Sequence, residues 1–140
     1  MMQAALQDRA RRAYQTTQVQ PDDPIALVVQ LYDGMLGFLR RGADHLACKE
    51  FVPAADRIRR AADILGELQA VLDMERGGEV AFNLDRLYAY SRRRLMEGHL
   101  QADPAALREI ADLLQPLRDA WAEARLKQMS CETESPVGAR

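Results

Sequence analysis

Histidines and carboxylates are the side chains that could support metal or acid–base chemistry in this chain. A carboxylate-bridged metal pair in a helical bundle needs a glutamate or aspartate three residues before an inward-facing histidine. The residue three positions before His45 is Gly42, and the residue three positions before His99 is Met96. Both histidines lie near expected helix ends, where a surface or capping role is the common one. The sequence therefore predicts no metal site and no cofactor.

The candidate nucleophiles and the paired glycines lack the neighbours that their chemistry requires. Cys48 and Ser91 have no histidine that the sequence places beside them. The two cysteines, Cys48 and Cys131, lack the spacing of a zinc or redox motif. Gly77 and Gly78 are not followed by the lysine and hydroxyl residue of a phosphate-binding loop. We expect no enzyme activity, so the function is sought in the surfaces of the protein.

Four helices are expected to position those surfaces. An aspartate followed by proline is a helix-start signal, and this pair occurs at 23–24 and at 103–104. Between these signals, apolar residues recur every three or four positions, and Gly77-Gly78 is expected to end one helix before the next begins. The expected helices span about 24–48, 53–76, 79–100 and 104–127. Rods of matched length joined by short loops predict an all-α fold, an antiparallel four-helix bundle with a short extra N-terminal helix or arm.

The organisation along the chain follows from these helices. We expect a mobile N-terminal arm at 1–22, the bundle at 23–127 and a disordered tail at 128–140. The N-terminus has no apolar core of a signal peptide, and no apolar run reaches the roughly 18 residues of a membrane span. We therefore expect a cytoplasmic protein without a membrane span.

Charge gives a weak argument for a nucleic-acid partner. The chain has 19 basic and 21 acidic residues, a formal charge of −2. Two basic clusters, Arg9–Arg12 and Arg92–Arg94, could contact phosphates. Consecutive arginines on a helix point about 100° apart, which favours a solvated face over one patch. A helical nucleic-acid-binding protein is therefore kept as the alternative function, and no nucleic-acid partner is expected.

The apolar stripes are wider than a minimal bundle core requires. Such a surplus predicts a groove for an amphipathic partner helix. The alternative is that kinks and the N-terminal arm cover the excess, and both interpretations stay open at this point. The surplus residues are Val29, Leu36, Phe38, Ile64, Val71 and Phe82.

Several motifs, in their order along the chain, resemble those of the flagellar secretion chaperone FliS family. They are Tyr14 in the arm, PIALVVQLYDG at 24–34, LDMERGGE at 72–79, NLDRLY at 83–88 and LRDAW at 117–121. The resemblance implies a four-helix bundle with a short additional N-terminal helix. It also implies a cytosolic export chaperone that binds the disordered C-terminal segment of flagellin, prevents its polymerisation and delivers it to the flagellar type III export apparatus.

On this resemblance, the expected partners are the flagellin C-terminal segment and a component of the flagellar export gate, with the chain itself a monomer or a weak homodimer. Physical reasoning agrees with such a role, because a groove that covers the apolar face of a flagellin helix removes the surface that would pair with another subunit. The expected partner-binding residues are Tyr14 in the arm, Leu27, Leu31 and Met35 on the first long helix, and Asn83, Leu87 and Tyr90 on the third.

Overall fold

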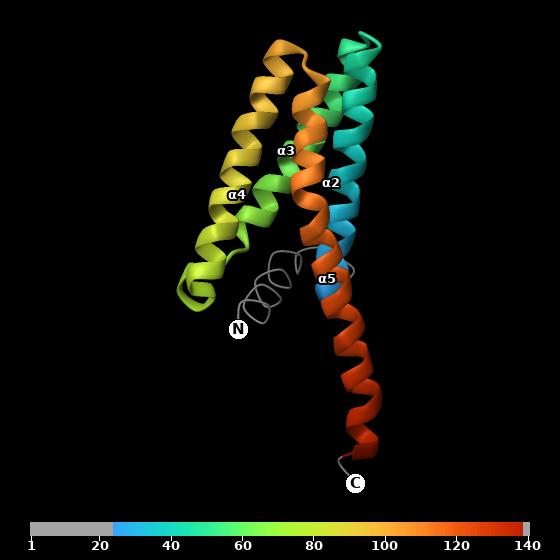
Figure 1. Cartoon of the computed structure of the whole chain (residues 1–140), viewed down its shortest axis with the longest axis vertical. Coiled ribbons are helices and arrows are strands. Elements are labelled where there is room, and N and C mark those ends of the chain that lie inside the picture. The colour runs from blue at the N-terminus through green and yellow to red at the C-terminus, as the bar shows by residue number, and fades with distance from the viewer. Residues whose placement is uncertain (1–23, 139–140) are drawn as a thin grey trace, which may run out of the picture.

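The computed structural model describes the backbone of residues 24–138 and the side chains of residues 25–130 (Figure 1). The described residues form four helices and no strand, which confirms the predicted all-α bundle. The arm predicted at 1–22, with Tyr14, lies outside the described residues. The helices are α2 (Pro24–Ala47), α3 (Phe51–Ala70), α4 (Met74–Gln101) and α5 (Pro104–Gly138).

The four helices form a ring in which each packs against two others. Helix α2 contacts α3 and α5, and α4 contacts the same two helices, so α2 and α4 lie diagonally opposite each other. Figure 1 shows that α5 extends well beyond the other helices, and that the α3–α4 turn stands apart from α2 and α5.

The core is built from the inward stripe of every helix, as the three-four spacing predicts. Tyr32 and Tyr88 are its largest fully buried side chains, and they come from the diagonal helices α2 and α4. The other fully buried large side chains are Ile25, Met35, Leu36, Leu39, Leu65, Leu68, Leu95, Leu107 and Ile110.

The turn between α3 and α4 differs from the prediction. Helix α3 ends at Ala70, not near Arg76, because the Asp73 carboxylate accepts hydrogen bonds from the backbone amides of Glu75, at 3.1 Å, and Arg76, at 3.0 Å. These bonds satisfy two amides that have no partner within the helix, so α4 begins early, at Met74. Gly78, with φ 56° and ψ −132°, interrupts the helical path and divides α4 into two helical segments, so the break predicted at Gly77-Gly78 is present, although the segment before it belongs to α4 and not to α3.

Helix α5 also runs further than predicted, to Gly138 instead of about Lys127. No glycine or proline occurs between Lys127 and Pro136, so nothing in the backbone chemistry interrupts the helical hydrogen bonds over that stretch. Trp121 is the last buried residue among the described side chains. The helix therefore continues beyond the end of the core. The apolar periodicity of the sequence indicated only the part of the helix that packs into the core.

Candidate functional site

The line along which α2 and α3 meet, here called the α2/α3 seam, is lined by apolar side chains with a glycine between them. Leu27, Leu31, Gly34 and Phe38 recur at helical spacing and so share one flank of α2. Opposite them, Ile64 lies close to Gly34, since a methyl group built on that glycine would stand 3.8 Å from its Cδ1 atom. That is ordinary van der Waals contact, so a methyl group at this position would fit against α3 without a clash.

The structure divides the three predicted residues of α2 between the seam and the core. Leu27 and Leu31 are half-buried, and Leu31 packs against the core. Met35 has an exposed fraction of 0%, so its side chain is a core residue that a partner does not reach in this structure. A wide apolar stripe has one inward line and two flanks, and spacing alone does not tell them apart.

The three predicted residues of α4 lie together on the side that meets α5, here called the α4/α5 seam. Asn83, Leu87 and Tyr90 follow one another at helical spacing and line one surface pocket together with Arg86 and Arg93. Asn83 is exposed, Leu87 is half-buried against the core, and Tyr90 is 36% exposed. This group combines apolar area with hydrogen-bonding side chains and two cations, the composition of a surface that binds a polypeptide.

A hydrogen-bonded cluster, here called the Glu109 cluster, ties this group to α5. The Tyr90 hydroxyl donates to Glu109 Oε2 at 2.5 Å, and Arg94 Nε donates to Glu109 Oε1 at 2.9 Å. Both hydrogen bonds lower the pKa of the Glu109 carboxyl, and the bond to Glu109 raises the pKa of the Tyr90 hydroxyl. Beside the cluster, a second pocket is lined by Ala105, Arg108, Glu109, Asp112 and Leu113 of α5.

The two seams lie on opposite sides of the bundle, because α2 and α4 are diagonal in the ring of helices. A hydrogen bond between the hydroxyl groups of Tyr32 and Tyr88 crosses the core from α2 to α4. Burial raises the pKa of the Tyr32 hydroxyl to about 12. The sequence grouped the candidate residues as one site, whereas the structure separates them into two surfaces that no small ligand spans.

The surplus of apolar residues is smaller in the structure than the sequence indicated. Leu36 and Val71 are buried, and Phe82 is 50% exposed. Val29, Phe38 and Ile64 are half-buried against the core. Sequence reasoning missed Gly34 and Glu109 as members of the two seams, although the small residue within an apolar run was a usable signal for the first.

Two of the side chains considered for chemistry, His45 and Ser91, are paired or buried in the bundle. His45 stands in the last turn of α2, and its Nδ1 atom lies 2.7 Å from Glu50 Oε1. Ser91 is fully buried in the bundle. Across the described residues no three His, Cys, Asp or Glu side chains are grouped so that they could hold a metal ion. None of the four helices, over the residues described, is long and apolar enough to cross a membrane.

Arg92–Arg94, the described part of the basic sequence considered for nucleic-acid binding, also contacts other groups of the bundle. Arg92 donates to Gln69 of α3 at 3.0 Å, whereas Arg94 donates to Glu109 of α5. The Arg93 guanidinium carbon lies 5.9 Å from the centre of the Tyr90 ring. The three side chains therefore diverge and form no single phosphate-binding patch; Arg9–Arg12 lies outside the described residues.

Comparison with known proteins places these surfaces in a family context. The family described as "Flagellar protein FliS" matches residues 6–128. The chain is 36% identical to the flagellar secretion chaperone FliS of Salmonella typhimurium, over 70% of this chain and 73% of the relative. It is 34% identical to FliSB of Pseudomonas aeruginosa over 81% and 93% of the two chains, and 30% identical to FliS of Bacillus subtilis over 80% and 83%. Both relatives carry the same printed description, flagellar secretion chaperone.

Proposed function

The chain belongs to the FliS family of flagellar export chaperones, which are not enzymes, and we propose that it binds the disordered C-terminal segment of flagellin in the cytoplasm. In that role it prevents premature polymerisation of flagellin and delivers it to the flagellar type III export apparatus, through contact with an export gate component. The chain acts as a monomer or a weak homodimer.

The observation that carries this proposal is the presence of two half-buried apolar surfaces on opposite sides of one bundle. One is the stretch of the α2/α3 seam around Gly34, where Leu31 and Phe38 are half-buried. The other is the pocket around Asn83 and Leu87 on the α4/α5 seam. A folded partner would meet only one side, whereas an extended chain with short amphipathic helices can wrap the bundle and occupy both.

Release without a nucleotide follows from the same physics. Ordering a disordered segment costs about 2 to 5 kcal/mol or more of the gross contact energy, which keeps the complex from becoming irreversible. The apolar face of each client helix is covered while it is bound, so that face cannot pair with a second flagellin. Competition from the export apparatus then suffices to remove the client. The N-terminal arm with Tyr14, when docked over one of the seams, would be displaced by the client.

Calorimetric titration of the protein with a flagellin C-terminal peptide tests the proposal. We expect a dissociation constant near micromolar or tighter, and a negative heat-capacity change from the burial of apolar surface. Absence of binding over that range, or binding without a heat-capacity change, would contradict the chaperone role for this client.

Two glycine variants test the contact surface. Gly34→Leu places a bulky side chain on the α2/α3 seam without removing a core side chain, and we expect peptide affinity to fall about tenfold. Gly66→Leu is the matched control, because a Cβ at Gly66 of α3 meets nothing within 4 Å and Gly66 is not one of the residues that line the seam. Circular dichroism must show both variants folded. Equal affinities in the two folded variants would exclude the surface around Gly34 as a contact.

A further inference from the structure

An aromatic ring at the α2/α3 seam has two guanidinium groups beside it, one from each helix. The Arg41 guanidinium carbon lies 5.2 Å from the centre of the Phe38 ring, and the Arg60 carbon lies 5.9 Å from it. Arg41 belongs to α2 and Arg60 to α3. The negative ring face attracts both cations, and this attraction holds two like charges near one another across the seam.

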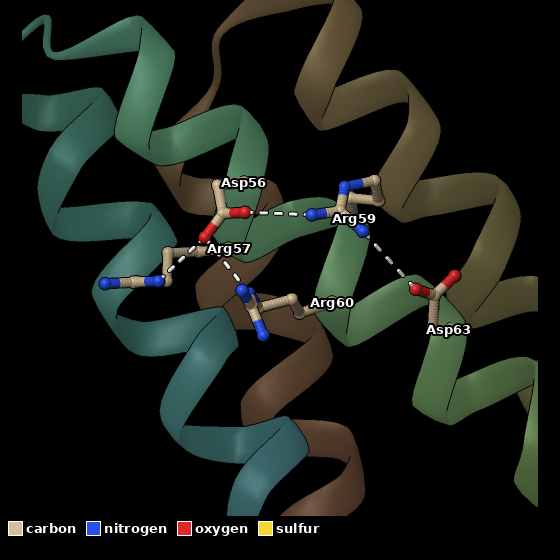
Figure 2. Close-up of polar contacts among 5 residues, drawn as sticks. All are labelled: Asp56, Arg57, Arg59, Arg60 and Asp63. Carbon is tan, nitrogen blue, oxygen red and sulfur yellow. Dashed lines mark hydrogen bonds and ion pairs between the residues drawn. The ribbon is translucent and has the colours of Figure 1, made fainter.

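One carboxylate on α3 pairs with three arginines, and one of these, Arg60, is the arginine beside the Phe38 ring. Figure 2 shows Asp56 between the guanidinium groups of Arg57, Arg59 and Arg60. Asp56 Oδ2 lies 2.8 Å from Arg57 Nη1 and 3.1 Å from Arg60 Nε, and Oδ1 lies 2.9 Å from Arg59 Nη2. The hydrogen bond from Arg60 is the main cause of the lowered pKa of Asp56. Asp63 supplies a second carboxylate, 3.8 Å from Arg59.

The local balance of charge is positive in a protein whose net charge is −2. The arginine cluster, defined as Arg41, Arg57, Arg59 and Arg60, has two carboxylates, those of Asp56 and Asp63, against its four cations. Arg60 contacts Asp56 through Nε, and none of the described carboxylates pairs with Arg41. Each guanidinium carries five N–H donors, so most donors beside Phe38 have no carboxylate partner in the described chain.

We propose that the arginine cluster, which includes the two guanidinium groups beside Phe38, is a docking site for an acidic segment of a partner polypeptide. A carboxylate placed between Arg41 and Arg60 accepts hydrogen bonds from both guanidinium groups, which the planar forks of arginine favour. The Phe38 ring supplies apolar area for the methylene groups of a glutamate side chain. The site lies along the same seam as Gly34 but does not rest on flagellin being the client.

The helical geometry favours a polypeptide over a nucleic acid as the occupant. Asp56 and Asp63 flank the cluster, and their negative charges would repel the continuous phosphate backbone of a nucleic acid. An acidic peptide can place single carboxylates beside Arg41 and Arg60 while its other residues avoid both aspartates. Oligonucleotide binding is accordingly an outcome of the test below that opposes the proposal.

Fluorescence anisotropy with labelled hexaglutamate tests the site on the full-length protein. At about 0.15 M salt the screening length is roughly 8 Å, so distant charges contribute little. We expect measurable binding that weakens at least about tenfold in the Arg41→Glu/Arg60→Glu double variant. The matched control is Lys49→Glu/Lys127→Glu, which makes the same change of net charge at exposed positions outside the cluster and should bind like the parent protein.

A second pair of measurements keeps the test decisive. Arg41→Lys/Arg60→Lys retains the charge but loses the planar forks, and we expect an intermediate affinity for hexaglutamate. Circular dichroism and thermal melting establish that each variant is folded. The proposal is overturned by absence of binding to the parent protein, by equal loss in the cluster variant and the lysine control, or by single-stranded hexathymidylate binding more tightly than hexaglutamate.

Discussion

The α2/α3 and α4/α5 seams are built from neighbouring helices of the same bundle, yet different forces hold them. Along the α2/α3 seam, a methyl group built on Gly34 would make only an ordinary contact with Ile64, and the Phe38 ring attracts cations from both helices. Along the α4/α5 seam, the Glu109 cluster fastens the helices, and near the α4–α5 turn a methyl group built on Gly98 would lie only 2.8 Å from Ala106 Cβ. A side chain at Gly34 would therefore be tolerated, whereas one at Gly98 would meet tightly packed atoms of α5.

This difference shows why a glycine in a helix has no single meaning. An interior glycine costs a helix roughly 0.5 to 1 kcal/mol relative to alanine, so its presence needs a reason in the packing. At Gly98 the reason is the close approach of α5 inside the bundle. At Gly34 the bundle itself supplies no such reason, which is consistent with a role in receiving a partner.

The largest expected effect separates the two glycines directly. Gly98→Ala should destabilise the protein by about 1 to 3 kcal/mol, because the contact with Ala106 has no flexible side chain that can move aside. Gly34→Ala should stabilise it by a few tenths to about 1 kcal/mol, since the helix gains and the space is free. Urea unfolding measures both variants. Equal destabilisation by the two would show that the α2/α3 seam is as tightly packed as the α4/α5 seam.

The Tyr32–Tyr88 hydrogen bond joins the helices that carry the two seams, and its removal is the next largest effect. Tyr88→Phe should destabilise the protein by about 1 to 2 kcal/mol, because it leaves one buried hydroxyl with fewer partners. The double variant Tyr32→Phe/Tyr88→Phe should cost less than the sum of the two single variants, since neither hydroxyl then needs a partner. A thermodynamic cycle from urea unfolding measures this coupling, and strict additivity would contradict it.

Alkaline pH probes the same pair. The pKa of Tyr32 is raised from 10.0 to about 12 in the folded protein, so the folded state holds this proton more tightly than the unfolded chain. The resulting stability is fully present below about pH 10 and is lost as the pH rises toward 12. Thermal melting at increasing pH should show a steeper loss for the parent protein than for the double phenylalanine variant. Parallel curves would exclude Tyr32 as a cause.

The smallest effect is expected from the exposed Glu109 cluster. Glu109→Gln removes the charge that Arg94 pairs with, and it should slightly lower the melting temperature and speed amide hydrogen exchange in α4 near Tyr90. Because the pKa of Glu109 is lowered in the folded state, its contribution is present above the unfolded value and is lost as the pH falls. The variant and the parent should therefore converge in acid, and a difference that persisted there would point to a cause other than charge.

Much of the bundle was predictable because the information is local in the chain. Pro24 and Pro104 mark two helix starts where they were expected. The exception was the α3–α4 turn, where α3 ends at Ala70 and the hydrogen bonds of Asp73 start a short helical segment before the glycines. The glycine signal did mark a break in the helical path, at Gly78.

The candidate site was predictable only in part. Helical spacing correctly placed Asn83, Leu87 and Tyr90 together, since residues three and four apart on one helix share a face whatever surrounds them. The same reasoning placed Met35 beside Leu31, although Met35 points into the core. Spacing along one helix carries no information about which flank of a wide stripe its neighbours cover.

The amino-acid sequence by itself determined the four helices, their apolar faces and the absence of the Glu-x-x-His spacing that a bundle metal site requires, because each depends on residues within a few helical turns. Only the tertiary structure decided that α2 and α4 are diagonal, that the candidate residues occupy two opposite seams, and that Arg41 and Arg60 share one aromatic ring. Those facts depend on which helices become neighbours, and that choice is made by packing between segments far apart in the chain.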